Sequence, residues 1–197
     1  MTGFVDPGKI QTNSGAQQGD LLVVTKPLGM GAISTGIARA RISSEVAQDA
    51  MVCMATLNRG AMEVAVEVGV DAMTDVGGYG IAEHANEMAE AAGLTVELEL
   101  KRMPLFEQAL ELVRTGMHSN AFRNTRAYLG SRPRARRGVD SRLVTLALDA
   151  ETSGGLLLAV DKGKVDALCD GLKARGAPAA AIVGRFVARR SCPVVLV

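Results

Sequence analysis

The chain has 197 residues, of which 48% are apolar, and this composition predicts one globular domain with a sizeable core and argues against disorder. Its 22 basic and 21 acidic side chains nearly cancel and only 3% of the residues are aromatic, so neither bulk charge nor a base-stacking surface favours a nucleic-acid binder. The sequence has no basic-then-apolar leader and no apolar run of about 18 residues, so we expect a cytoplasmic protein with no membrane partner.

The first half of the chain predicts alternating strands and helices. The elements are an extended segment at 1–10, a strand at 21–26, a helix at 31–41, a long helix capped by Ser43 or Ser44 and continuing to Gly69, a strand at 69–74, a helix at 81–91 and a strand at 95–100. The last of these alternates polar and apolar residues, so one of its faces is expected to meet water.

The second half continues the alternation. It predicts a helix at 105–115, a loop at 116–138, a short strand at 144–148, a buried strand at 156–160, a helix at 164–175 and closing strands at 180–187 and 194–197. The fold class is therefore α/β or α+β, with a mixed sheet flanked by helices.

The strongest functional signal is the turn Thr74-Asp75-Val76-Gly77-Gly78-Tyr79-Gly80, which joins a buried strand to a helix. Glycine backbone and a helix N-terminus together favour an anion such as phosphate. A carboxylate at this place, Asp75, can hold a hard cation such as Mg²⁺ against that anion. The spacing fits a structural role equally well, in which Asp75 caps the helix and the glycines make the turn.

Other polar positions also allow two interpretations. His84 is either a general acid or base or, as we favour, a packed histidine on a helix face. Thr152 and Ser153 either donate to an anion or form a turn. Lys26 either approaches a phosphate or, more commonly for such a position, lies at the surface. The cysteines Cys53, Cys169 and Cys192 are too scattered to predict a disulfide framework or a zinc site.

Arginines dominate one stretch, Arg132-Pro133-Arg134-Ala135-Arg136-Arg137. We favour a solvated, mobile loop here over a surface that binds polyphosphate or a partner protein.

Three blocks in the same order carry a family resemblance: residues 19–29, with Lys26-Pro27-Leu28-Gly29, then residues 74–80, and then residues 149–155, with Thr152-Ser153-Gly154-Gly155. Through them the chain resembles selenophosphate synthetase (selenide, water dikinase), within the aminoimidazole ribonucleotide synthetase-like superfamily of ATP-using enzymes. The resemblance spans nearly the whole chain. The family commonly has Thr and Phe where Gly77 and Tyr79 stand, and Gly-His-Leu where this chain has Glu83-His84-Ala85.

The resemblance implies that residues 1–16 end a missing N-terminal ATP-binding domain and that residues 17–197 form a C-terminal synthetase domain. The full-length parent would make selenophosphate from selenide, ATP and water, releasing AMP and phosphate, with Mg²⁺ as cofactor, and would form a homodimer through its N-terminal half.

The resemblance also assigns site residues. Asp75 would be a metal ligand, and five positions would lie near the phosphates or nucleotide: Gly77, Gly78, Gly80, Thr152 and Ser153. The reactive Cys or selenocysteine and its Lys would lie upstream, so we expect no catalytic residue on this chain and an inactive isolated fragment.

Two other functions stay open. The first is another ATP-dependent synthetase or kinase of the same superfamily, which acts on a nucleotide or thiamine precursor. The second is a non-catalytic regulatory module of selenium metabolism that acts through the arginine-rich loop.

Overall fold

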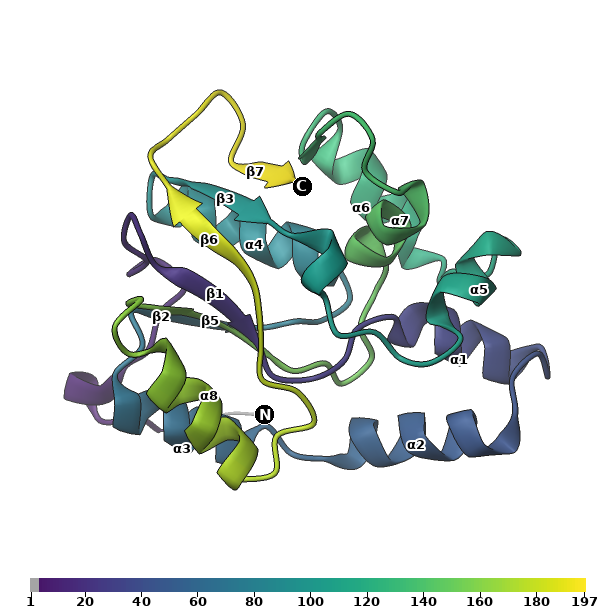
Figure 1. Cartoon of the computed structure of the whole chain (residues 1–197), viewed down its shortest axis with the longest axis horizontal. Coiled ribbons are helices and arrows are strands. Elements are labelled where there is room, and N and C mark those ends of the chain that lie inside the picture. The colour runs from purple at the N-terminus through teal and green to yellow at the C-terminus, as the bar shows by residue number, and fades with distance from the viewer. Residues whose placement is uncertain (1–3) are drawn as a thin grey trace.

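Apolar runs along the chain form a seven-stranded sheet in the computed structural model, which describes residues 4–197 (Figure 1). In spatial order the strands are β2 (Ala72–Asp75), β5 (Leu156–Val160), β1 (Leu21–Val24), β6 (Ala181–Val187), β3 (Thr95–Leu98), β7 (Val194–Leu196) and β4 (Arg134–Ala135). The pairs β3–β7 and β4–β7 are parallel and the other pairs are antiparallel, so the sheet is mixed, as predicted.

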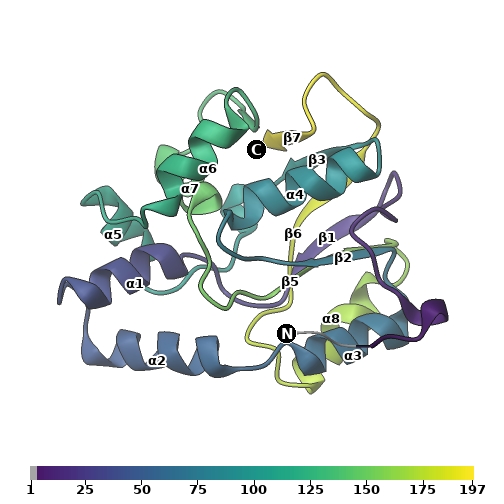
Figure 2. The same cartoon turned by 180° about the vertical axis from the view of Figure 1, so that it is seen from behind.

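Helices cover both faces of this sheet (Figures 1 and 2). They are α1 (Met30–Ala38), α2 (Ser44–Ala55), α3 (Arg59–Val68), α4 (Gly80–Ala91), α5 (Ala109–Arg114), α6 (Ala121–Leu129), α7 (Ser141–Leu148) and α8 (Val165–Ala174). The predicted class, a mixed sheet flanked by helices, is confirmed. None of the helices within residues 4–197 is long and apolar enough to cross a membrane.

The alternation of side chains along β5 shows why two layers of helices are needed. Leu157 and Ala159 lie in the core cluster beneath α4 and α7, whereas Leu158 and Val160 lie in the cluster beneath α3 and α8. Because both faces of the strand are buried, every residue of β5 is apolar. A third cluster, around Ile33, joins α1, α2 and α5 beside the sheet.

The predicted long second helix is wrong, because the chain breaks between α2 and α3. Ser43 caps α2 as expected, since its Oγ accepts a hydrogen bond from Val46 N at 3.3 Å. The Lys26 side chain binds carbonyl groups at the end of α2, because its Nζ donates to Cys53 O at 3.0 Å and to Thr56 O at 2.7 Å. The last carbonyl groups of a helix have no partner within the helix, so an ammonium group that binds them favours the end of α2 at this point.

Three further element predictions are corrected. The expected strand at 144–148 is the end of α7, which begins after Asp140, whose carboxylate accepts from Arg142 N. The expected loop at 116–138 contains α6 and the short β4, and the helix expected at 105–115 is shortened to α5. Within the predicted extended segment 1–10, residues 1–3 lie outside the described residues, and Pro7–Lys9 form a 3-10 turn rather than a strand.

The predicted wet face of β3 is also wrong. Glu97, expected to face water, is only 3% exposed, and its carboxylate accepts hydrogen bonds from Arg136, Arg185 and Arg190. The three guanidinium groups replace water around this carboxylate, so a charged residue can occupy the middle of the sheet.

Candidate functional site

The two glycine-rich turns lie side by side, although about 75 residues separate them along the chain. β2 and β5 pair so that Asp75 is opposite Leu156. Beyond the ladder, Val76 N donates to Gly155 O at 2.8 Å and Glu151 N donates to Gly77 O at 3.0 Å. The structure thus brings the 74–80 block and the 149–155 block into one surface region.

Two glycines make this close approach possible. A Cβ built on Gly154 would lie 2.2 Å from Val76 O, and one on Gly80, whose φ is 75°, would lie 2.5 Å from Asp149 O. Both contacts are with backbone atoms, so any side chain would push the turns apart. Gly78 differs, because a Cβ there would meet nothing within 4 Å. Its backbone is the part of the turn that is open to a ligand.

Asp75 stands exposed at the end of β2. No hydrogen bond to its carboxylate is found within the described chain, and the N-cap residue of α4 is Tyr79, so the structure gives no support to helix capping by Asp75. Its free oxygens are of the kind that Mg²⁺ prefers. Residues 4–197 contain no group of three His, Cys, Asp or Glu placed to hold a metal ion.

His84, in the first turns of α4, binds the backbone of the 74–80 turn. The Gly77 N–H donates to His84 Nε2 at 3.0 Å, so Nε2 carries no proton and the ring acts as an acceptor. The ring is buried and packs edge-on against Tyr79, with the two ring centroids 6.5 Å apart. Its Nδ1 lies 3.4 Å from Glu87 Oε2. This geometry supports the packed, structural role for His84, and it also shows that the Gly77 N–H is already used.

The two hydroxyl residues of the second turn differ. Ser153 has a φ of 51°, and its Oγ donates to Met54 O at 2.8 Å, which favours the turn-forming interpretation. Thr152 is exposed at the tip of the same turn. Thr152 is therefore exposed to solvent, whereas Ser153 joins the turn to α2.

Sequence reasoning missed three buried ionisable side chains around these turns. Lys26, expected at the surface, is 2% exposed and also donates to Ser153 O at 2.9 Å; burial lowers the pKa of its ammonium group. Glu151 accepts from Gly29 N at 2.7 Å and Met30 N at 2.9 Å, at the start of α1, and burial raises its pKa to about 8. Asp149 accepts from Ser119 N at 3.1 Å. A signal was present for Lys26 and Asp149, because each lies directly after a buried, mainly apolar run.

The arginine-rich stretch is partly ordered by ion pairs. Arg132 bonds Glu90 at 2.9 Å and Arg136 bonds Glu97 at 2.6 Å, while Arg134 and Arg137 are exposed. The stretch therefore closes the edge of the sheet at β4 rather than forming a free loop.

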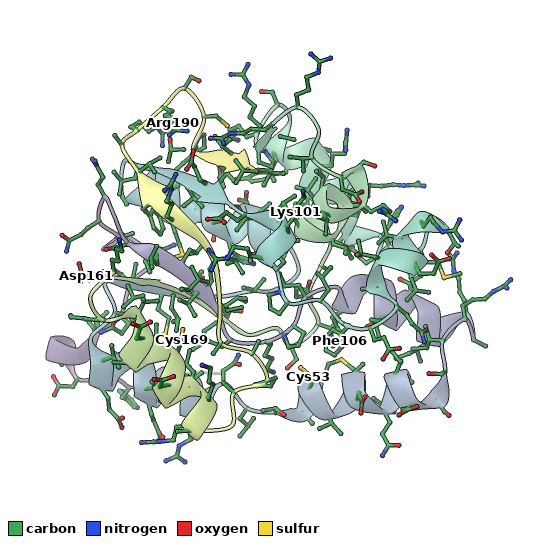
Figure 3. All side chains as sticks on the ribbon, in the orientation of Figure 1. Cys53, Lys101, Phe106, Asp161, Cys169 and Arg190 are labelled. Atoms are coloured by element: carbon green, nitrogen blue, oxygen red, sulfur yellow. The ribbon has the colours of Figure 1, made fainter. Side chains whose placement is uncertain are left out.

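The cysteines are free thiols on separate elements, and Cys53 on α2 lies well away from Cys169 on α8 (Figure 3). Cys53 is buried, as predicted, and burial raises the pKa of its thiol.

Comparisons with known proteins agree on one family. A family model described as "AIR synthase related protein, C-terminal domain" matches residues 17–196. Selenide, water dikinase 2 of Peptoclostridium acidaminophilum is 34% identical over 197 residues, which cover 100% of this chain and 56% of the relative. Selenide, water dikinase of Caldanaerobacter subterraneus subsp. tengcongensis is 39% identical over 185 residues, which cover 94% of this chain and 54% of the relative. The chain thus spans about half the length of these curated relatives.

Solved structures show the same fold at lower identity. Thiamine-monophosphate kinase from Stenotrophomonas maltophilia superposes with a TM-score of 0.67 at 15% identity, covering 98% of this chain and 54% of that one. HypE of E. coli, a hydrogenase maturation protein, superposes with a TM-score of 0.64 at 20% identity, covering 94% of this chain and 48% of that one.

Proposed function

The chain belongs to the family of AIR synthase related C-terminal domains, and we propose that it is the C-terminal half of an enzyme that makes selenophosphate from selenide, ATP and water, releasing AMP and phosphate. The observation that carries the proposal is the identity of 34% and 39% to two proteins named selenide, water dikinase, over nearly all of this chain. The solved kinase and maturation proteins, at 15% and 20% identity, support the fold alone.

The paired turns are the part of this chain that faces the chemistry. Asp75 would supply one oxygen ligand to Mg²⁺, which when bound neutralises the charge of the polyphosphate. Gly78 and Thr152 are exposed, one on each turn, and would approach the phosphates. Gly77, Gly80 and Ser153 set the shape of the two turns, since their contacts are with His84, Asp149 and Met54.

In this proposal the C-terminal half and an N-terminal half of the enzyme have different roles. Residues 17–197 form the synthetase domain described above, and residues 1–16 lead from an N-terminal ATP-binding domain. That domain would supply the reactive Cys or selenocysteine with its Lys, the remaining metal ligands, and the surface of a homodimer. The proposed nucleotide, ATP, follows from the relatives named selenide, water dikinase; one solved HypE structure of the same fold is a complex with ATP.

The test uses the full-length parent with Asp75→Asn, because the proposed reaction needs both halves. We expect loss of most selenide-dependent AMP release and an increased magnesium requirement, since one anionic ligand is removed where charge develops. Asp166→Asn, an exposed acid on α8, is the matched control and should keep wild-type activity. Circular dichroism checks that both variants stay folded. Asp75→Asn activity within a few-fold of wild type at every magnesium concentration would refute the metal role.

A further inference from the structure

A cavity of ≈ 350 Å³ opens between the start of α4 and α6, next to the Asp75 turn. The side chains that line it are Tyr79, Glu83, Glu87, Asn124 and Tyr128. It lies outside the set of positions assigned to the proposed phosphoryl chemistry.

Glu83 is the unusual member of this wall. Its side chain is buried, the residue being 3% exposed, yet Oε2 has no hydrogen-bond partner in the part of the chain that the structure describes. Burial, followed by the nearby Glu87 charge, raises the pKa of Glu83 to about 7. Leaving a buried carboxyl oxygen without a donor is costly, so such a group in a native protein suggests a ligand that supplies the donor.

The charges around Glu83 leave the cavity acidic. Glu87 follows one helical turn later, on the same face of α4, and Glu90 lies a further turn along. Arg132, whose charge acts on Glu83, donates to Glu90 at 2.9 Å rather than to Glu83. No Lys or Arg is among the side chains that line the cavity. A cationic ligand therefore matches the site.

The size and lining of the cavity distinguish between kinds of cation. A volume of ≈ 350 Å³ is far larger than a bare metal ion needs, and no group of three metal-ligating side chains exists within residues 4–197. Two exposed tyrosine side chains line the cavity and suit a flat organic cation, because aromatic faces attract guanidinium groups. The fork of a guanidinium also matches a carboxylate better than a compact ammonium does.

We propose that this cavity binds a guanidinium group, with the carboxyl group of Glu83 as its buried acceptor and Glu87, Asn124 and the rings of Tyr79 and Tyr128 around it. The ligand is either a small free guanidinium compound or an arginine side chain of a polypeptide. This inference is independent of the proposed synthetase activity.

The test is a titration of the ¹⁵N-labelled chain with methylguanidinium chloride, at constant ionic strength and at a pH above the pKa of Glu83. We expect saturable shifts of the amide signals of residues 79–87 and of the Asn124 side chain, with a dissociation constant in the millimolar range. Glu83→Gln should weaken binding at least about tenfold, the equivalent of ~1.4 kcal/mol. Glu107→Gln, an exposed acid outside the cavity, should not change it.

Glu87→Gln provides a second test at the exposed rim, in case Glu83→Gln perturbs the fold, which the same spectra would reveal. A short arginine-containing peptide that binds more tightly than methylguanidinium assigns the site to a polypeptide, and equal affinity assigns it to a free small molecule. The proposal is overturned if shifts do not saturate, if binding survives in Glu83→Gln and Glu87→Gln alike, or if methylammonium binds as well as methylguanidinium.

Discussion

Replacing Lys26 by methionine tests how the 149–155 turn is held to the α2–α3 break. The ammonium group donates to Cys53 O, Thr56 O and Ser153 O at 3.0, 2.7 and 2.9 Å. Methionine keeps the length of the side chain but removes all three donors, so the carbonyls lose their partner.

The magnitude follows from opposing terms. Each charged hydrogen bond contributes ~1.5 to 3 kcal/mol net, but burying the ammonium offsets part of the sum. We therefore expect the free energy of unfolding to fall by about 3 kcal/mol, a large share of the ~5 to 15 kcal/mol typical of a domain. For a chain of this size the Tm should fall by about 6 to 12 °C.

Urea denaturation followed by circular dichroism measures this loss, with Lys164→Met as the matched control. Lys164 Nζ also donates to a carbonyl at a helix end, Gly69 O at 3.0 Å, but on the surface. Its loss should cost less than about 1 kcal/mol. If Lys26→Met and Lys164→Met were destabilised equally, the buried ammonium would not be what joins these segments.

Two further outcomes are expected. Glu97→Gln should lose about 2 to 3 kcal/mol near neutral pH. The pKa of Glu97 is lowered chiefly by the hydrogen bond from Arg185, so the stability that Glu97 contributes is complete above pH 4.5 and is lost as the pH falls through the lowered pKa of the folded state. Urea midpoints measured from neutral to acid pH should therefore depend less on pH in the variant than in the wild type. Gly154→Ala places a Cβ 2.2 Å from Val76 O and should lower the free energy of unfolding by about 2 to 3 kcal/mol. Gly78→Ala meets nothing within 4 Å and should lower it by less than about 0.5 kcal/mol. Thermal melts compare the two variants, and equal losses of stability would contradict the packing argument.

The hydrophobic pattern within a segment was enough to predict those strands and helices that do not depend on distant contacts. The apolar run of β5 and the periodic helix α4 needed no distant information, and the α/β class followed from their alternation. The short apolar run at 144–148 misled the prediction because length alone does not separate a strand from a buried helix. The Asp140 cap that starts α7 was the available signal.

Long-range charge contacts explain the other misses. The break after α2 depends on Lys26, which is 27 and 30 positions from the carbonyls it satisfies. Burial of Glu97 depends on arginines 39 to 93 positions away, so a simple alternating pattern suggested a wet face. At the candidate site, the position of Asp75 was predictable from its turn, whereas the hydrogen bonds to Asp149 and Glu151 come from Ser119 and Gly29, which are distant in the sequence.

The place of β7 in the sheet has a consequence for biosynthesis. β7 comes last along the described chain, yet it lies between β3 and β4, and β4 has no other strand partner in that part of the molecule. On a ribosome, β3 would therefore keep an open hydrogen-bonding edge until residues 194–196 emerge from the exit tunnel. Parallel pairing across this sequence distance is slow to form. The nascent chain should thus depend on chaperones that shield the edge of β3, and a stalled or truncated product would be the form most prone to aggregate.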